Sequence, residues 1–271
     1  MKTIHPKGLF SKIMTAVGIY FLTVFAVQAQ DTAYEPVYLL REYMKVQPGM
    51  EADYLKLEQT WKKVHLQRKA DGGILDWGLY RRVFPSGTNV EYDYMTITIF
   101  KNGKKFEESG AIPWDYIVKL MDQQDMTVME NTDNYRKLVS RSIDVLLERV
   151  QRNGPNIQVI DVQALPGQGA ELVRIEKMMN PVFVEACKSG AIASWGFGQY
   201  MFPMSQEQGG YYRYISTNSL DGMFKLSSSG YLEKAFKKVY PSKNFDATMK
   251  SISNIVTIKK TELWKEMDST F

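Results

Sequence analysis

The sequence predicts an α+β protein made of two tandem copies of one strand–helix–strand–strand–helix–strand unit. Residues 38–85 align with residues 156–203 without a gap, at a constant offset of 118 positions. Both copies show the same succession of strand and helix patterns, and a repeat of this kind fixes the architecture before any single residue is interpreted. Eleven positions are identical in the two copies: Pro48/Pro166, Gly49/Gly167, Ala52/Ala170, Glu58/Glu176, Val64/Val182, Gly72/Gly190, Ile74/Ile192, Trp77/Trp195, Gly78/Gly196, Phe84/Phe202 and Pro85/Pro203.

The first copy opens with a strand and a long helix. Residues 37–46 are rich in β-forming residues and stop at Pro48-Gly49, which is a turn signal. Residues 50–69 then place apolar side chains at positions 50, 54, 57, 61 and 64. This spacing predicts a helix with one stripe facing the core, and Gly72-Gly73 ends it.

Three further strands and a helical region complete the first copy. Residues 74–84 form a strand that Pro85 stops, and residues 92–100 alternate apolar and polar side chains as a third strand does. Residues 101–137 are rich in Met and predict two helical pieces broken near Pro113. Residues 140–149 fit a fourth strand, although their leucines are also compatible with a longer helix.

The second copy follows the same plan after a linker at residues 151–155. We therefore expect a first repeat over residues 36–150 and a second over residues 156–268. The expected strands and helices of the second copy are residues 157–164, 170–188, 192–202, 211–217, 220–254 (helical) and 256–266.

Alternation along the second strand separates two faces of each predicted sheet. One face carries Trp77 in the first copy and Trp195 in the second, among apolar neighbours, so we assign this face to the helices and the two tryptophans to the core. The opposite face mixes aromatic and polar groups such as Tyr80 and Arg82, whereas a face turned to solvent is more uniformly polar. We infer that these mixed faces meet and enclose a partly polar space. Gly78 and Gly196 are expected to mark a bulge or a close approach of the backbone.

The order of elements is that of a ferredoxin-like unit. Two fused units of this kind, with Pro-Gly before the first helix and an aromatic second strand, resemble the dimeric α/β-barrel superfamily. This group includes small antibiotic-biosynthesis-type monooxygenases, stress-responsive barrel proteins and NIPSNAP-like proteins. The resemblance implies a pseudo-dimeric α/β barrel with its two sheets packed face to face. It also implies a small, often aromatic ligand or a haem between the sheets, but no catalytic signature of one member is matched.

The same alternation predicts which side chains face the enclosed space. Arginines and tyrosines that converge among aromatic groups are typical of a site for a small molecule, because Arg binds carboxylates and Tyr orients or stacks on a ring. The alternative is that these groups pair with one another and fill the barrel. The predicted ligand-binding residues are Arg41, Tyr43, Tyr80, Arg82, Tyr94, Tyr200 and Arg213, and the candidate catalytic residues are His65, Asp76 and Asp161.

His65 is the only histidine after the predicted signal peptide, and it aligns with Phe183 in the second copy. A position that accepts Phe is expected to face the core, and one His without partners does not make a metal site. No metal and no cofactor is predicted. A haem held by His65 stays an open alternative that nothing else in the sequence supports.

The first 29 residues have the layout of a secretory signal peptide. Lys2, Lys7 and Lys12 precede an apolar stretch at residues 13–27, and cleavage is expected after Ala29. An uncleaved membrane anchor is the alternative. Removal of these three lysines from the 34 basic residues leaves 31, against 30 acidic ones. This balance argues against a nucleic-acid partner. We expect a periplasmic or secreted monomer or homodimer with no membrane partner after cleavage.

Three classes of function remain open at this point. The first is an exported protein that binds a small aromatic or apolar acid between the sheets. The second is a cofactor-independent monooxygenase or isomerase, which would need a base near the ligand. The third is a structural or interaction module with a filled barrel.

Overall fold

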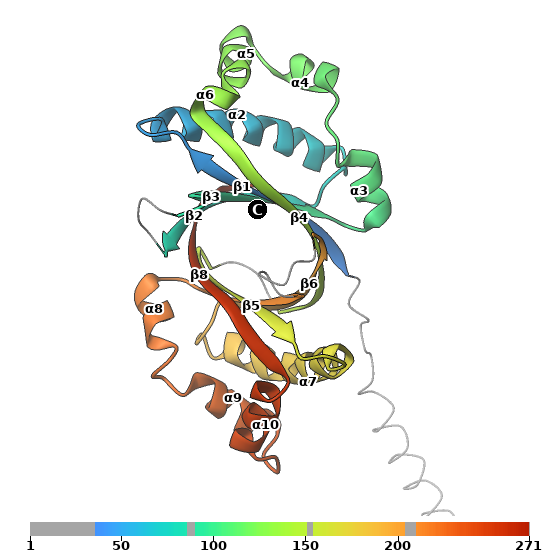
Figure 1. The fold of residues 1–271 in the computed structure, drawn as a ribbon, viewed down its shortest axis with the longest axis vertical. Coiled ribbons are helices and arrows are strands. Elements are labelled where there is room, and N and C mark those ends of the chain that lie inside the picture. Colours follow the sequence, from blue (N-terminus) through green and yellow to red (C-terminus); the bar gives the residue numbers. More distant parts are fainter. Residues whose placement is uncertain (1–35, 86–89, 151–153, 204–209, 271) are drawn as a thin grey trace, which may run out of the picture. The chain divides into compact units, whose positions relative to one another are not determined.

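The computed structural model describes residues 36–85, 90–150, 154–203 and 210–270, which form one closed barrel of eight strands with helices around it (Figure 1). Contacts group this part of the chain into one compact unit, Pro36–Phe271. The predicted signal peptide lies outside the described residues, as do positions 151–153 of the predicted linker.

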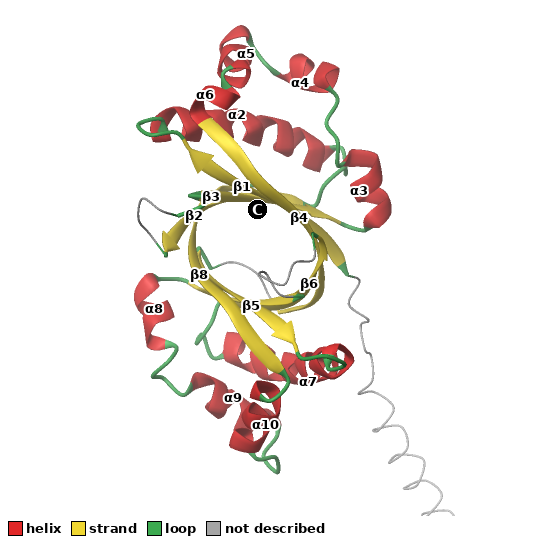
Figure 2. Cartoon of the chain, viewed as in Figure 1, coloured by secondary structure: helices red, strands yellow, loops and turns green. Residues whose placement is uncertain are grey.

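Each half contributes four strands to the barrel, and all helices lie outside it (Figure 2). Two expectations need correction: residues 101–137 hold four short helices rather than two, and both fourth strands are longer than predicted. The first half contains β1 (Val37–Val46), α2 (Glu51–Ala70), β2 (Asp76–Phe84), β3 (Tyr94–Phe100), α3 (Gly103–Ser109), α4 (Trp114–Leu120), α5 (Gln123–Glu130), α6 (Thr132–Tyr135) and β4 (Arg136–Val150). The second half contains β5 (Asn156–Ala164), α7 (Gly169–Lys188), β6 (Ser194–Phe202), β7 (Tyr211–Thr217), α8 (Leu220–Lys225), α9 (Tyr231–Val239), α10 (Phe245–Ser253) and β8 (Val256–Ser269).

The strand order confirms the predicted fold class of two ferredoxin-like repeats in a pseudo-dimeric α/β barrel. Around the barrel the order is β1-β3-β2-β8-β5-β7-β6-β4, so each half keeps the order fourth–first–third–second. The long fourth strands close the barrel. β4 pairs with β1 in its own half and with β6 in the other, and β8 pairs with β5 and then with β2. Closure in this way removes the exposed edges that an open sheet would have.

Matched glycines fix both ends of the two long helices. Gly49 and Gly167 precede α2 and α7 with φ of 79° and 75°, a conformation that costs Gly nothing and other residues much more. Gly72 and Gly190 follow the same helices with φ of 69° and 74°. The identity of these glycines in the two copies therefore has a local backbone cause.

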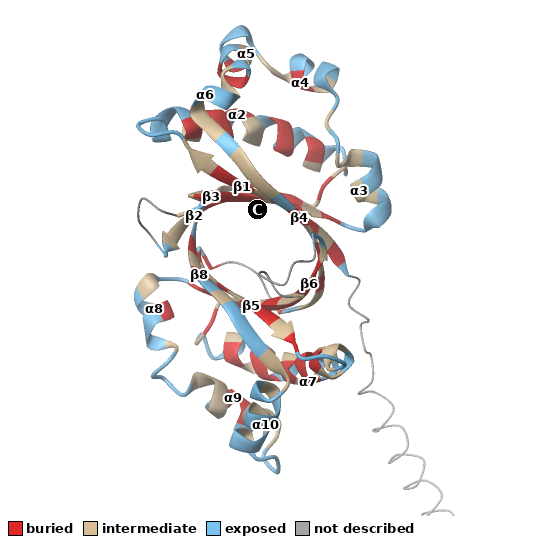
Figure 3. Cartoon of the chain, in the orientation of Figure 1, coloured by how far each residue is buried: buried red, intermediate tan, exposed pale blue. Residues whose placement is uncertain are grey.

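Two apolar cores lie between the sheet and the helices, one in each half (Figure 3). Trp77 is in the core under α2 and Trp195 is in the core under α7, as the alternation predicts. Each core buries the apolar stripe of its long helix, which is the main stabilisation available to an amphipathic helix.

A third cluster of side chains fills the inside of the barrel. It is aromatic: Tyr43 lies 4.7 Å from Tyr92 between ring centroids, and Tyr92 stacks on Trp264 at 5.9 Å. Gly196 and Gly198 allow two further tyrosines to enter, since a Cβ on either glycine would overlap the ring of Tyr214 or Tyr212. The close approach predicted at Gly196 is thus a tyrosine ring from the neighbouring strand β7.

Candidate functional site

Five of the seven predicted ligand-binding residues converge inside the barrel: Arg41, Tyr43, Tyr80, Arg82 and Tyr200. These inner groups also pair with one another, although Arg82 Nε and the Tyr212 hydroxyl have no hydrogen-bond partner among the described residues. Arg41 Nε lies 2.7 Å from Asp144 Oδ2, and Arg82 Nη1 lies 3.0 Å from Glu262 Oε1. Burial of these mutually paired groups favours the filled-barrel interpretation of this space. A ligand-binding role for them stays a prediction.

The other two predicted residues, Tyr94 and Arg213, lie on the opposite face of the sheet. Tyr94 packs on Tyr54 of α2 at 4.8 Å between ring centroids, and Arg213 pairs with Glu176 of α7. The prediction takes Tyr92 and Tyr211 as the starting points of the alternation. Tyr92, however, lies before the first residue of β3, so it does not share the period of that strand. The matched positions of β3 and β7 are 117 residues apart rather than 118. Tyr212, not Arg213, faces into the barrel.

The three candidate catalytic residues do not share a cavity. The carboxylate of Asp161 accepts a hydrogen bond of 2.7 Å from the Tyr200 hydroxyl inside the barrel. Asp76 lies 2.6 Å from Lys69 Nζ, near the C-terminal end of α2. His65 alone lines the cavity described next, so no catalytic constellation of these three residues forms.

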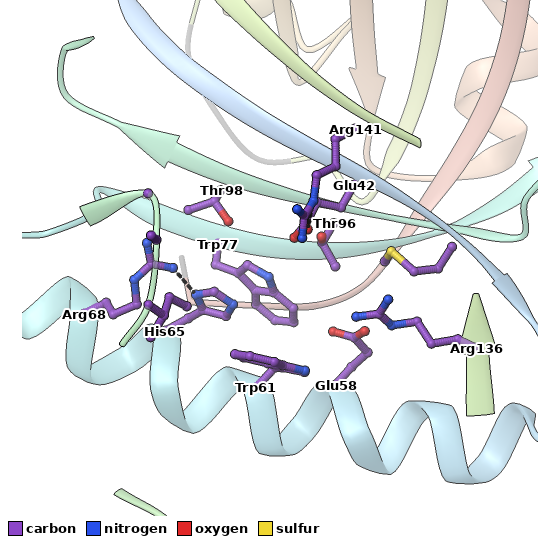
Figure 4. A pocket seen from close by; sticks show the side chains of 14 residues that line it. Glu42, Glu58, Trp61, His65, Arg68, Trp77, Thr96, Thr98, Arg136 and Arg141 are labelled. Atoms are coloured by element: carbon purple, nitrogen blue, oxygen red, sulfur yellow. Dashed lines mark hydrogen bonds and ion pairs between the residues drawn. The ribbon is translucent and has the colours of Figure 1, made fainter. Parts of the chain in front are cut away.

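A cavity of about 280 Å³ lies between α2 and the sheet of the first half (Figure 4). Glu58, Trp61, His65 and Arg68 line it from α2, where spacings of three and four residues place them on one face of the helix. Trp77, Thr96 and Thr98 line it from β2 and β3, and Arg136 and Arg141 from β4; Glu42, Met44, Gly110, Ala111 and Ile112 complete the wall.

His65 is held in this wall by an aromatic and a cationic neighbour. Its ring stacks on Trp77 with 5.1 Å between centroids and 12° between planes. Arg68 Nη1 lies 3.0 Å from His65 Nδ1. A guanidinium can only donate, so Nδ1 accepts and the ring proton is on Nε2. Burial and the charge of Arg68 lower the pKa of His65 well below its ordinary value, and the ring is neutral.

Glu58 is a buried acid on the same wall. Its exposed fraction is 3%, and burial raises its pKa to about 7 against the opposing effect of Arg136. No described cation forms an ion pair with it. Trp61 Nε1 and Arg136 Nε are buried without a hydrogen-bond partner among the described residues. Such groups are costly to bury unless something else satisfies them.

The equivalent place in the second half is filled. Phe183 replaces His65 and stacks on Trp195 with 4.3 Å between centroids. Strand pairing matches Thr96 with Arg213 and Thr98 with Ile215. Arg213 Nε donates to Glu176 Oε1 at 2.7 Å, so the matched acid is neutralised there.

A larger cavity of about 640 Å³ lies beside α8, with an apolar wall that includes Val83, Phe84, Phe224 and Leu263. Glu262 is the one acid on its wall, and Arg82 and Lys260 both pair with it. The cavity under α2 is the better candidate for chemistry, because its wall brings a buried acid together with the unpaired donors of Trp61 and Arg136.

Comparisons with known proteins agree with the fold. No protein-family model matches the chain, and no curated protein matches its sequence. A solved structure of a candidate monooxygenase from Fusobacterium nucleatum subsp. nucleatum is 10% identical with a TM-score of 0.51, over 86% of this chain and 93% of that one. At this identity the likeness shows the fold alone.

Two further structures have the same general architecture at lower scores. A haem-binding protein from Thermus thermophilus is 9% identical with a TM-score of 0.47, over 87% of this chain and 92% of that one. A variant of chlorite dismutase from Candidatus Nitrospira defluvii is 11% identical with a TM-score of 0.44, over 86% and 91%. These scores are too low to carry an argument about this protein.

The surroundings of His65 do not fit a haem ligand. A metal-bound His coordinates through one nitrogen and donates its other N–H to a carboxylate or carbonyl. In His65 the nitrogen beside Arg68 accepts instead, which leaves the proton on the nitrogen that would face the metal. The wall also carries three arginines and two acids in a space of about 280 Å³, a volume just below the usual range for drug-sized ligands. We therefore derive no step through haem.

The described part of the chain contains no cluster of three or more His, Cys, Asp or Glu side chains placed to hold a metal ion. Within the same residues, no helix has both the length and the apolar character that crossing a bilayer requires.

Four residues of this wall are not among the predicted site residues: Glu58, Trp61, Arg68 and Arg136. One signal for the first three was present: they share a helix face with His65, and their matched residues in the second copy are Glu176, Met179 and Ala186. A polar face in one copy and a mainly apolar one in the other indicates a site in the first.

Proposed function

We propose that the protein binds a small planar or aromatic monoanionic acid in the cavity under α2. The observation that carries this proposal is the contrast between the halves: Phe183 and the Arg213–Glu176 pair fill the space that is hollow in the first half. The sequence predicts a small aromatic or apolar acid between the two sheets, whereas the place proposed here is the helix side of the sheet.

The charge of the wall favours a single negative charge. Arg141 is neutralised by Glu42, whose Oε1 lies 2.7 Å from Arg141 Nε. Arg68 keeps its charge, because its pKa is lowered only to about 10. With Arg136 also charged and Glu58 ionised, the wall has a net charge of about +1. A carboxylate on Arg136 would satisfy its unpaired Nε.

The size and the aromatic wall limit the ligand further. A volume of about 280 Å³ corresponds to roughly nine water molecules at ~30 Å³ each. Trp61, His65 and Trp77 lie close together, with 6.1 Å between the ring centroids of Trp61 and His65. Such a wall favours a flat ligand that can stack on a ring.

Titration of the purified protein with benzoate and phenylpyruvate tests this proposal, with tryptophan fluorescence and calorimetry as readouts. Benzyl alcohol and benzylamine are the neutral and cationic controls. We expect both acids to bind and the controls to bind at least tenfold more weakly, a difference of about 1.4 kcal/mol. Equal binding of benzoate and benzyl alcohol, or no binding of either acid, would overturn the proposal.

A matched pair of variants locates the site. Thr98→Ile installs the residue of the second half and should weaken benzoate binding about tenfold or more. Ile215→Val changes the matched position of the other half, which lies on the wall of the larger cavity beside α8. It should leave binding unchanged, and weaker binding would place the ligand in that cavity instead.

We also propose that the chain is exported and cleaved after Ala29, on the layout of residues 1–29. Intact-mass measurement of protein recovered from the periplasm or the medium should then give a chain that begins at Gln30. A full-length mass in the membrane fraction would instead indicate a retained anchor.

A second candidate function, catalysis, is favoured by one observation. Glu58 is a buried acid that titrates near neutrality on the wall of the cavity, and such groups are enriched at catalytic sites.

A further inference from the structure

The two halves carry the same glutamate in two different states. Glu58 and Glu176 occupy matched positions on α2 and α7, and both are buried, with exposed fractions of 3% and 2%. Glu176 is paired with Arg213 from the neighbouring strand. Thr96, which is uncharged, occupies the strand position in the first half that matches Arg213.

A buried carboxylate outside an ion pair is unfavourable because desolvation penalises its charge, and the hydrogen bond with Tyr54 and the charge of Arg136 offset only part of this cost for Glu58. Glu58 borders the cavity, and the labelled side chains of α2, β3 and β4 point toward one another across that space (Figure 4). Arg136 and Trp61 beside it hold unpaired donors. An acid that can give and take a proton therefore lies next to two donors suited to an oxyanion.

We propose that Glu58 is the acid–base group of this cavity and that the bound acid is a 2-oxo acid, whose keto–enol tautomerisation Glu58 catalyses. This inference rests on the proposed binding function and adds the substrate class and the reaction.

The reaction is a proton transfer that needs no other reactant. The Glu58 carboxylate takes a proton from the carbon next to the keto group, and the C–H electron pair forms the new carbon–carbon double bond. The π electrons of the keto group move to its oxygen, which receives a hydrogen bond from Trp61 Nε1–H. The protonated Glu58 then gives this proton to the enolate oxygen, which forms the enol, or returns it to the carbon, which restores the keto acid; either step regenerates the carboxylate. Arg136 binds the carboxylate of the ligand.

The electrostatic environment suits a general base that works near neutral pH. Burial raises the pKa of Glu58 to about 7, and the groups facing it are Arg136 from β4 and Tyr54 from α2, which lower it, and Glu42 from β1, which raises it. A base is most effective when its pKa is close to the working pH. Proton transfer should accordingly rise with pH through about 7 and level off above it.

The test is deuterium incorporation at the carbon next to the keto group of phenylpyruvate, followed by proton NMR in D₂O with the purified full chain. We expect exchange above the buffer rate, and a loss of about 100-fold or more in Glu58→Gln, since general acid–base catalysis contributes about 10²–10⁴-fold. Phenylpyruvate should still bind to Glu58→Gln, because the variant keeps the shape of the side chain. Glu51→Gln, an exposed acid in the first turn of the same helix, is the matched control and should exchange normally.

A second variant keeps the proposal testable if Glu58→Gln is poorly folded. Thr96→Arg recreates the arrangement of the second half, where the strand arginine neutralises the helix glutamate. It should abolish exchange and remove the pH dependence near 7 in a protein with a normal circular dichroism spectrum.

The possible failures are distinguishable. If phenylpyruvate and benzoate do not bind to the wild-type protein, the proposed function is wrong. If phenylpyruvate binds but exchange is absent, or persists unchanged in Glu58→Gln, the binding proposal stands and the role of Glu58 is overturned.

Discussion

The two halves of this barrel share a fold, and they differ in the space between the long helix and the sheet. Under α7 this space is a solid core in which Phe183 lies on Trp195 and Glu176 is paired with Arg213. Under α2 the same space is a cavity lined by His65, Glu58 and three arginines. The two halves are equivalent scaffolds. The difference between them shows that one half can be packed for stability while the other contains a polar site.

The largest expected effect is a loss of stability in the close-packed core under α7. Phe183→Ala should lower the free energy of unfolding by about 3–5 kcal/mol, because it opens a cavity in a close-packed core. His65→Ala at the matched position should cost less than about 2 kcal/mol, because that side chain already borders a cavity. Urea denaturation of both variants checks this order, and equal losses would mean that the two sites are packed alike.

The matched glutamates should respond in opposite ways to the same substitution. Glu176→Gln leaves Arg213 without its carboxylate and should cost about 3 kcal/mol, the low end for a broken buried pair, because Arg213 is 19% exposed. Glu58→Gln breaks no ion pair and should not lower the free energy of unfolding at pH 6, because the amide, unlike the carboxyl, does not ionise in the unfolded state. Chemical denaturation at that pH provides the measurement, and a Glu58→Gln protein as unstable as Glu176→Gln would show that Glu58 is structural.

The pH dependence of stability should show the same asymmetry. The pKa of Glu58 is raised from 4.5 to about 7, so the folded state holds its proton more tightly than the unfolded state between these values. The contribution of Glu58 to the free energy of unfolding is therefore fully present below pH 4.5 and is lost as the pH rises through 7. Its upper limit is about 3 kcal/mol. Asp144, whose pKa burial raises to about 6, acts in the same direction. The difference between wild type and Glu58→Gln isolates Glu58, and identical pH profiles would contradict the shift.

The smallest expected effect comes from filling the cavity. Thr98→Ile should change the free energy of unfolding by no more than about 1 kcal/mol, since added apolar contact offsets the lost hydroxyl. Thermal melting with and without benzoate checks this. The variant should keep its melting temperature and lose the increase that benzoate gives the wild type. A large drop in melting temperature would mean that there is no free volume at position 98.

The repeat, the strand–helix order and the faces of the regular strands could be predicted from the sequence. Trp77 and Trp195 lie where the alternation places them, and so do Arg41 and Tyr200. The alternation predicts the wrong face of the sheet for Tyr94, because it starts from Tyr92, which lies before β3. The period of two holds only within a continuous strand.

The proposed site lies on the other side of the sheet from the predicted one, for a different reason. Aromatic and charged residues on a facing strand predict either a ligand cavity or a self-satisfied interior, and only pair distances such as 2.7 Å for Arg41–Asp144 favour the second. Thr96 and Thr98 were unremarkable as single residues. Their meaning depends on which residues of the second half they match, and that equivalence follows from strand pairing rather than from the constant offset.

The closing strand β8 has a consequence for the order of assembly. The backbone of Trp77, which forms part of the cavity wall, is bonded to Thr270 in both directions: Thr270 N donates to Trp77 O at 2.9 Å, and Trp77 N donates to Thr270 Oγ1 at 2.9 Å. Lys69 of α2 also reaches the carbonyl oxygen of Thr270. A chain synthesised from its N-terminus therefore makes the residues of the cavity well before the residues that brace them. The first half can acquire its finished binding surface only after the whole second half has emerged and the barrel has closed.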